Sequence, residues 1–221
     1  MATHRIIIVD DHPLFRSALS QTLASEDVAV EEAGGLDALT AALEANRDCD
    51  LVLLDLNMPG VRGFSGLLLV RAQYPEIPVM IVSAVEDPAI IRRCFDLGAS
   101  GYLSKSESAA NIRTSIRTVL DGGLWLPEGI SLDAEEDDAQ KDMLARLATL
   151  TPQQVRVLMM LSDGLMNKQV AYELSISEAT VKAHVSAILQ KLNVDSRTQA
   201  VIAAARIEQG QFAPLVEDES A

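Results

Sequence analysis

The chain has 221 residues, enough for two domains, and none of its apolar stretches approaches the roughly 20 residues that a membrane-spanning helix needs. The two cysteines, Cys49 and Cys94, suit neither a metal site nor a disulfide framework, and the N-terminus lacks a signal-peptide pattern, so we expect a cytoplasmic protein with no membrane partner. The net charge of −14 is uneven: residues 1–125 carry −7, residues 126–147 carry −5 and residues 148–213 carry +1, so only the last block suits a polyanion.

Short apolar runs alternate with amphipathic stretches over the first 125 residues. The runs predict strands at 6–10, 28–31, 51–55, 79–83 and 101–104, and the stretches between and after them predict helices near 13–24, 36–46, 65–74, 88–97 and 108–121. Five strands that alternate with five helices predict an α/β fold, a doubly wound parallel five-stranded sheet covered on both faces. In such a sheet the loops at the carboxyl ends of the strands hold the chemistry.

Acidic side chains follow two of the predicted strands. Asp10 and Asp11 come after the run Ile6 to Val9, and Asp55 ends the run LVLLD, which looks fully buried. A buried, unpaired carboxylate costs several kcal/mol or gives up its charge, and three carboxylates at one edge repel one another. A hard divalent cation relieves this repulsion, and carboxylates suit Mg²⁺. The sequence therefore predicts a Mg²⁺ site, although each acid taken alone also fits a cap for the next helix.

Two further strand ends add a hydroxyl, Ser83, and a positive charge, Lys105. A carboxylate nucleophile, a metal, a hydroxyl and a lysine together are suited to phosphoryl transfer, in which the cations neutralise charge on the transferred group. Asp55 would then accept the group as an acyl phosphate. Taken alone, Lys105 also fits an ordinary surface lysine.

The segments IIIVDDHPLFRSAL, LVLLDLNMPG, VMIVSA and GASGYLSK together resemble the flavodoxin-like receiver domain of bacterial two-component response regulators, over residues 1 to about 125. The resemblance implies that Asp55 is the phosphoacceptor, modified by a sensor histidine kinase. It also implies a Mg²⁺ site in which Asp11 and Asp55 bind directly, Asp10 binds through water and Asn57 offers its backbone carbonyl.

The same resemblance implies a phosphoryl-sensing set made of Ser83, Tyr102 and Lys105, in which Ser83 reorients and Tyr102 turns inward. Ordinary packing of a half-buried tyrosine is the alternative for Tyr102. His12 is expected in the loop before the first helix rather than as a ligand. Many receivers have proline after the lysine where this chain has Ser106, which leaves the isomer of that peptide bond open.

Residues 126–147 include the acidic run Glu135 to Asp138 and are interpreted as a solvated linker. Residues 148–212 are expected to form a second, all-α domain. Its short helix at 167–174, the tight connection Ser175 to Ser177 and a following helix that Ser177 caps have the spacing of a helix-turn-helix.

The last of these helices has two different faces. Val181, Val185, Ile188 and Leu192 lie together and are expected to pack on the core, whereas Ala183 and Ser186 lie opposite with cations beside them. A small or polar face with flanking cations can enter the major groove of DNA. An ordinary amphipathic helix with a solvated face is the alternative.

The segments LTPQQ, GLMNKQVA, TVKAHV, KLNV and SRTQA resemble the LuxR-type DNA-binding domain of NarL/FixJ response regulators, across roughly residues 148–205. The resemblance implies that Lys182, Ala183 and Ser186 face the bases and that the helix after Arg197 supports dimerisation. It also implies DNA phosphate contacts by three residues, Thr180, Lys191 and Arg197. Gln153 and Gln154 depart from the usual arginine and glutamate.

The expected function is that of a non-enzymatic transcription factor, in which phosphorylation of Asp55 controls homodimerisation and binding to double-stranded promoter DNA. One alternative is a haloacid-dehalogenase-like phosphatase, which needs a second acid two residues after its nucleophile, where this chain has Asn57. Another is a regulator that ignores phosphorylation and responds to a protein partner. Such a regulator is expected to lose part of the phosphorylation site. The three carboxylates, the Ser83 hydroxyl and the Lys105 ammonium are all present in this sequence.

Overall fold

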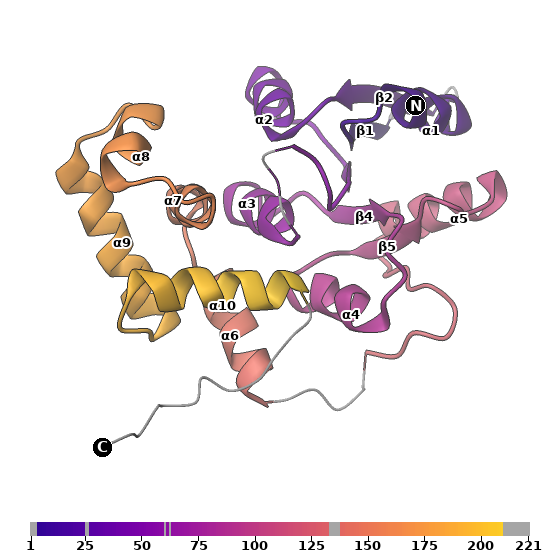
Figure 1. The fold of residues 1–221 in the computed structure, drawn as a ribbon. Coiled ribbons are helices and arrows are strands. Elements are labelled where there is room, and N and C mark those ends of the chain that lie inside the picture. The colour runs from indigo at the N-terminus through magenta and orange to yellow at the C-terminus, as the bar shows by residue number, and fades with distance from the viewer. Residues whose placement is uncertain (1–3, 25–26, 60, 62, 133–137, 210–221) are drawn as a thin grey trace. The chain divides into compact units, whose positions relative to one another are not determined.

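A computed structural model describes residues 4–24, 27–59, 61, 63–132 and 138–209 of the chain (Figure 1). The chain divides into two compact units, one up to Leu132 and one from Asp133. No helix among the described residues is both long and apolar enough to cross a membrane.

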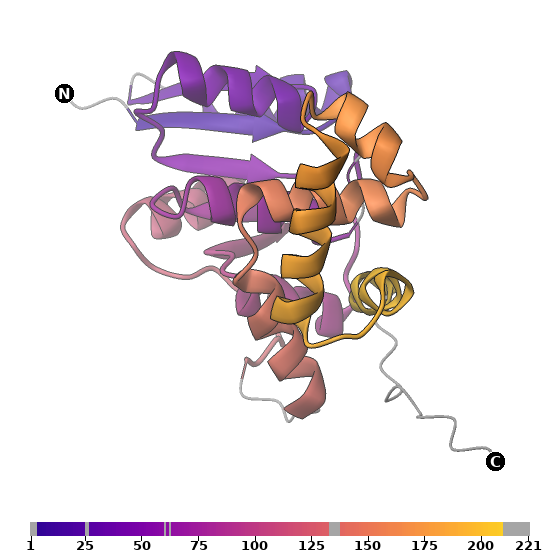
Figure 2. The ribbon, with the colours of Figure 1, turned by 90° about the vertical axis from the view of Figure 1, so that its left-hand side faces the viewer.

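The first unit is built on a parallel sheet whose strand order is β2-β1-β3-β4-β5. Figure 2 shows the arrows of neighbouring strands pointing the same way. The predicted fold class is confirmed, because all five expected strands are present. Their bounds are β1 His4–Val9, β2 Val28–Ala33, β3 Leu51–Leu54, β4 Val79–Ser83 and β5 Gly101–Ser104.

Five helices alternate with the strands and cover both faces of the sheet. Helices α1 and α5 lie on one side, and α2 and α3 lie on the other (Figure 1). Parallel strands need such crossover connections, because a short hairpin reverses the chain direction. The bounds are α1 Pro13–Leu23, α2 Leu36–Ala45, α3 Ser65–Gln73, α4 Pro88–Asp96 and α5 Ala109–Leu120.

The central strands are apolar on both faces, as expected for a sheet covered on both sides. Ile6, Ile8, Leu51 and Leu53 pack with residues of α1 and α5 in one core cluster. The side chains that alternate with them, such as Leu54, are equally buried. The parallel pairing of β1 with β3 places Val9 opposite Leu54, so the residues that follow both strands emerge at one edge of the sheet.

A segment that the sequence did not predict to pair lies beside β5. Trp125 forms an isolated parallel bridge with Gly101. Its carbonyl accepts a hydrogen bond from the Tyr102 amide at 3.0 Å, and its own amide donates to the Ser100 carbonyl at 3.2 Å. The residues directly after α5 therefore satisfy backbone groups of β5 that would otherwise be free.

The second unit contains only helices in its described residues, and the expected all-α domain is confirmed. Helix α6 begins at Asp138, inside the segment expected to be linker, because Leu144 and Leu147 give it an apolar face that is buried. The acidic residues 135–137 lie outside the described part of the chain. The bounds are α6 Asp138–Ala148, α7 Pro152–Ser162, α8 Asn167–Glu173, α9 Glu178–Leu192 and α10 Arg197–Gln209.

The expected helix-turn-helix lies in α8 and α9. Ser177 caps α9 as predicted, and its hydroxyl accepts a hydrogen bond from the Thr180 amide at 3.0 Å. Ser175, in the turn before it, has a φ of 52°, a backbone conformation that residues other than glycine seldom adopt. Val181 and Ile188 have no exposed surface and Val185 is half-buried, so most of the predicted inner face of α9 is packed on α7 and α8.

Candidate functional site

Three carboxylates meet at the carboxyl ends of β1 and β3, as the sequence predicts. Asp10 and Asp55 directly follow these strands, and both are buried, with 2% and 3% of their surface exposed. Ligand atoms of Asp10, Asp11, His12 and Asp55 all lie within 4.8 Å of one another. Because the backbone of each strand is fixed by ladder hydrogen bonds on both sides, the acids are held close despite their repulsion.

Lys105 reaches into this cluster from the end of β5. Its Nζ lies 2.6 Å from Asp10 Oδ2 and 2.8 Å from Asp55 Oδ2, and 4.8 Å from the centre of the Phe15 ring. Burial alone would lower the pKa of Lys105, but the hydrogen bonds to Asp10 and Asp55 outweigh it and raise that pKa. Lys105 is therefore a fixed positive charge between two acids, and not an ordinary surface lysine.

The surroundings of Asp55 affect both the pKa and the position of its carboxyl group. Burial raises the pKa of its carboxyl above the ordinary value, and the hydrogen bond from Lys105 opposes this rise without cancelling it. Its Oδ1 accepts a hydrogen bond of 3.3 Å from the Asn57 amide. Asn57 therefore lies next to the cluster, where the sequence placed it, and its carbonyl as a metal ligand stays a prediction.

The donor set fits a hard divalent cation. Three carboxylates supply oxygen ligands, which such cations prefer. Oδ1 of Asp11 is buried and accepts no hydrogen bond from any described residue, although the His12 ring nitrogen Nδ1 lies 2.9 Å away. An acidic cluster with a single lysine is consistent with a divalent-cation site beside Asp11.

His12 is closer to the cluster than the sequence suggested. It occupies the position before the first turn of α1, as expected for a loop residue, yet its Nδ1 also lies 3.1 Å from Asp10 Oδ1. The only signal for this contact was its place directly after two acids. Phe15, which lies over the Lys105 ammonium, was expected only as part of the apolar face of the first helix.

Ser83 is the last residue of β4, and Tyr102 lies within β5. Both side chains are buried. The Tyr102 hydroxyl donates to the Val85 carbonyl at 2.6 Å, and Ser83 Oγ accepts from the Val85 amide at 3.2 Å. Burial raises the pKa of Tyr102 above its ordinary value, so the phenol stays protonated and able to donate. The ring therefore packs inward, and the loop after β4 joins both residues.

The loop after β5 carries the remaining polar contacts near the site. The Lys105 amide donates to the Ser83 carbonyl at 2.9 Å, which fixes the lysine beside β4. Ser104 Oγ donates to Glu86 Oε1 at 2.8 Å, and Ser106 Oγ donates to the same oxygen at 3.4 Å. Every described peptide bond is trans, the one between Lys105 and Ser106 included.

In the second unit, the predicted base-facing residues lie on the exposed face of α9. Lys182, Ala183 and Ser186 are exposed, and Lys182 Nζ lies 3.3 Å from Glu178 Oε1, one turn earlier. Thr180 is exposed at the start of the helix, where its hydroxyl is 2.8 Å from that of Ser177. The arrangement leaves a narrow strip of small side chains, which permits close approach to a groove.

Lys191 and Arg197 are both engaged within the unit. Lys191 Nζ donates to the Thr149 carbonyl at 2.6 Å and to Gln154 Oε1 at 2.8 Å. Arg197 Nη2 donates to the Leu165 carbonyl at 2.6 Å. Both cations therefore tie the end of α9 and the start of α10 to earlier parts of the unit, a role that the sequence did not suggest. Their contacts with phosphate stay a prediction.

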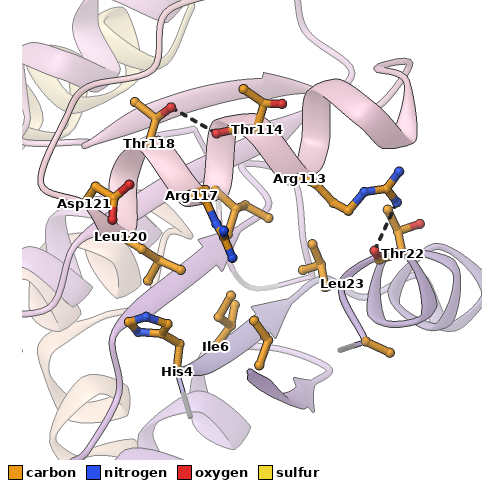
Figure 3. A pocket seen from close by; sticks show the side chains of 13 residues that line it. His4, Ile6, Thr22, Leu23, Arg113, Thr114, Arg117, Thr118, Leu120 and Asp121 are labelled. Atoms are coloured by element: carbon orange, nitrogen blue, oxygen red, sulfur yellow. Dashed lines mark hydrogen bonds between the residues drawn. The ribbon is translucent and has the colours of Figure 1, made fainter. Parts of the chain in front are cut away.

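A groove of about 610 Å³ lies at the other edge of the sheet, where β1 and β2 begin. Arg113 and Arg117 on α5 point across it toward α1 and β1 (Figure 3). None of the residues predicted to bind a metal, a phosphoryl group or DNA lines this groove. The acidic cluster is a separate feature at the opposite edge.

Two family models match the chain. Residues 6–117 match the response regulator receiver domain, and residues 148–204 match the bacterial regulatory proteins of the luxR family. A glycerol metabolism activator of Pseudomonas putida is 39% identical over 214 residues, which cover 93% of this chain and 96% of that protein. The nitrate/nitrite response regulator protein NarP of Escherichia coli is 36% identical over 204 residues, covering 90% and 93%.

Among solved structures, the response regulator RcsB in its DNA complex aligns with a TM-score of 0.54 over 92% of this chain and 98% of that chain. Its sequence identity of 21% makes this a likeness of fold alone. The two family models and the relatives of similar length carry the assignment. The chain belongs to the response regulators that join a receiver domain to a DNA-binding domain of the LuxR family, a group of transcriptional regulatory proteins.

Proposed function

We propose that Asp55 accepts a phosphoryl group from a sensor histidine kinase. A carboxylate oxygen of Asp55 attacks the phosphorus of a phosphohistidine, the P–N bond breaks, and the imidazole leaves with the bonding electrons. The observation that supports this most is the buried Asp55 carboxylate, which lies 2.8 Å from the Lys105 ammonium and close to two further acids. Lys105 is placed to neutralise charge on the incoming group.

Asp10, Asp11 and Asp55 would hold Mg²⁺, with the Asn57 carbonyl as a further ligand. The bound ion would supply positive charge against the phosphoryl oxygens. Ser83 would donate a hydrogen bond to the same oxygens. This rotation of the Ser83 side chain would break the hydrogen bond that it accepts from the Val85 amide. The hydrogen bond from the Tyr102 hydroxyl to the Val85 carbonyl would then change as well. The phosphoryl group would thus be sensed through the loop after β4.

The output would be the binding of promoter DNA by α9. Lys182, Ala183 and Ser186 would face the bases, and Thr180 would contact phosphate beside them. Because the DNA-binding block carries so little net charge, one chain alone would bind weakly. We propose that phosphorylation favours a homodimer, with α10 as part of its interface, that binds paired half-sites.

The protein would act in the cytoplasm, where its DNA partner lies, and as a regulator rather than an enzyme. A phosphatase of the haloacid dehalogenase type needs an acid for proton transfer two residues after its nucleophile, and Asn57 has none. Only phosphotransfer to Asp55 and slow loss of that group are expected.

Genome-wide DNA capture with the wild-type chain and the Asp55→Asn chain tests this function. Kinase or acetyl phosphate should enrich a defined set of promoters for the wild type and leave the variant unchanged. Footprints on the captured promoters, with and without the phosphodonor, would then locate the half-sites. Equal capture by both chains would favour a regulator that ignores phosphorylation.

A further inference from the structure

Lys191 is the last cation of α9, and its ammonium group is fixed by two partners. Its Nζ donates to the Thr149 carbonyl, in the turn before α7, and to Gln154 Oε1, in the first turn of α7. An ammonium group has three N–H donors, so one remains after these two bonds. Lys191 is half-buried, which leaves that donor a path to solvent.

The buried side chain of Gln154 also makes a hydrogen bond within its own helix turn. It belongs to a capping box, in which its Oε1 accepts from the Thr151 amide at 3.0 Å while Thr151 Oγ1 accepts from the Gln154 amide. The same oxygen therefore receives both the Thr151 amide and the Lys191 ammonium. Only 7% of Gln154 is exposed, so its amide is held firmly.

Both acceptors of the Lys191 ammonium are uncharged. Among the ion pairs of the described residues, none includes Lys191. Lys182, the other lysine of α9, has Glu178 beside it at 3.3 Å. Lys191 is thus the cation of α9 that is fixed in place without being neutralised.

We propose that Gln154 is a positioning residue that fixes Lys191 while leaving its full charge available to DNA. The inference rests on the proposed function, since it concerns the DNA contacts of the second unit. A glutamate at this position could make the same two hydrogen bonds, but it would pair the lysine and remove its charge from the field that DNA meets. In a block whose net charge is +1, one paired lysine is a large fraction of the total.

Gln154→Glu is the test, because the change is isosteric and adds one negative charge. Gln153→Glu is the matched control: it adds the same charge in the same first turn of α7, with a similar helix-dipole effect, and residue 153 is not among the hydrogen-bond acceptors of Lys191 in the described part of the chain. The full chain is used, with duplexes that the wild type selects from a random-sequence pool. Binding is measured across roughly 50 to 200 mM salt, and thermal unfolding is measured at low and high salt.

Gln154→Glu should bind the selected duplexes more weakly, with a salt slope smaller by about 0.9 for each bound chain. It should also unfold at a higher temperature than Gln153→Glu at low salt, and lose that gain at high salt, as an ion pair requires. Gln153→Glu should keep the wild-type slope.

Two results would overturn the inference. One is a Gln154→Glu chain that binds with the wild-type slope. The other is a Gln154→Glu chain whose unfolding temperature shows no salt-sensitive gain over the control. A wild-type chain that selects no duplex at all would instead contradict the proposed function, and the unfolding comparison would still report on the Lys191 pair.

Discussion

Asp55 places a carboxyl group at the end of β3, where our proposal needs it and where a charge is unfavourable for the fold. Its carboxyl is buried, its pKa is raised by that burial, and Lys105 offsets only part of the cost. A strand that was selected for stability alone would end on an apolar or neutral residue. The charge is tolerated because Lys105, and on our proposal Mg²⁺, lie beside it.

Replacing Asp55 by asparagine should therefore stabilise the chain in the absence of divalent cations. A raised pKa means that the folded chain holds a proton more readily than the unfolded chain does. The ionised carboxyl thus destabilises the fold at neutral pH, and this penalty fades as the pH falls back toward the ordinary value of 3.8. We expect Asp55→Asn to unfold a few degrees higher at neutral pH in EDTA. A variant that unfolds at a lower temperature there would contradict this assignment of the charge.

Removing the Lys105 ammonium should slow phosphorylation strongly. Lys105→Met leaves Asp10 and Asp55 without their shared partner and takes a cation away from the phosphoryl oxygens. By analogy with the loss of one stabilising donor elsewhere, the rate of acetyl-phosphate labelling should fall by about 100-fold. Lys105→Arg is the matched variant, because it keeps the charge. Equal labelling of the wild type and Lys105→Met would rule out a role for the ammonium.

Helix α9 depends on the turn that precedes it. Ser177 caps its N-terminus and Asn193, with a φ of 54°, closes its C-terminus, while Lys191 and Arg197 fasten that end to the rest of the unit. Helix α9 is thus fixed at both ends. A helix held in this way loses little conformational freedom when it enters a groove.

Ser177→Ala should weaken this arrangement. Loss of the hydrogen bond to the Thr180 amide should lower the free energy of unfolding of the second unit by about 1 kcal/mol, and Ser177→Asp should restore most of it. Chemical denaturation followed by circular dichroism measures both changes. If the alanine variant proves as stable as the wild type, the cap contributes nothing here.

The sequence predicts elements well and contacts between elements poorly. The strands, the Ser177 cap and the acidic cluster follow local rules of periodicity, capping and strand order. The position of Trp125 beside β5 and the bonds from Lys191 to Thr149 and Gln154 join residues that are distant along the chain, and no local pattern encodes such pairs. Helix α6 was missed in part because acidic residues obscure its apolar positions.

The charge of the chain is distributed unevenly along its length. The receiver residues carry −7 and the DNA-binding block carries +1, so attraction to DNA depends on a few placed cations rather than on an overall field. Binding of this kind should be weak for single chains and should depend on pairing. Phosphorylation that favours a pair would then change affinity without adding any contact to the bases.

This division leads to an expectation about salt. A pair of chains with few phosphate contacts should lose less than about 1000-fold in affinity between roughly 50 and 200 mM salt. The footprint obtained with phosphodonor should therefore survive at the higher concentration, while the weaker binding seen without donor disappears. Fluorescence anisotropy on a captured promoter measures both. A much steeper loss would mean that many more phosphates are neutralised than the described cations can reach.

Mapping of the phosphoryl group by mass spectrometry tests most directly whether the buried acid at the end of β3 receives it. The intact chain is incubated with acetyl phosphate and Mg²⁺, then digested and sequenced. We expect one phosphoryl group, on Asp55, that requires the divalent cation and is absent from Asp55→Asn. A chain that takes up no group, or carries it on another residue with Asp55 unmodified, would contradict the proposed role of the cluster.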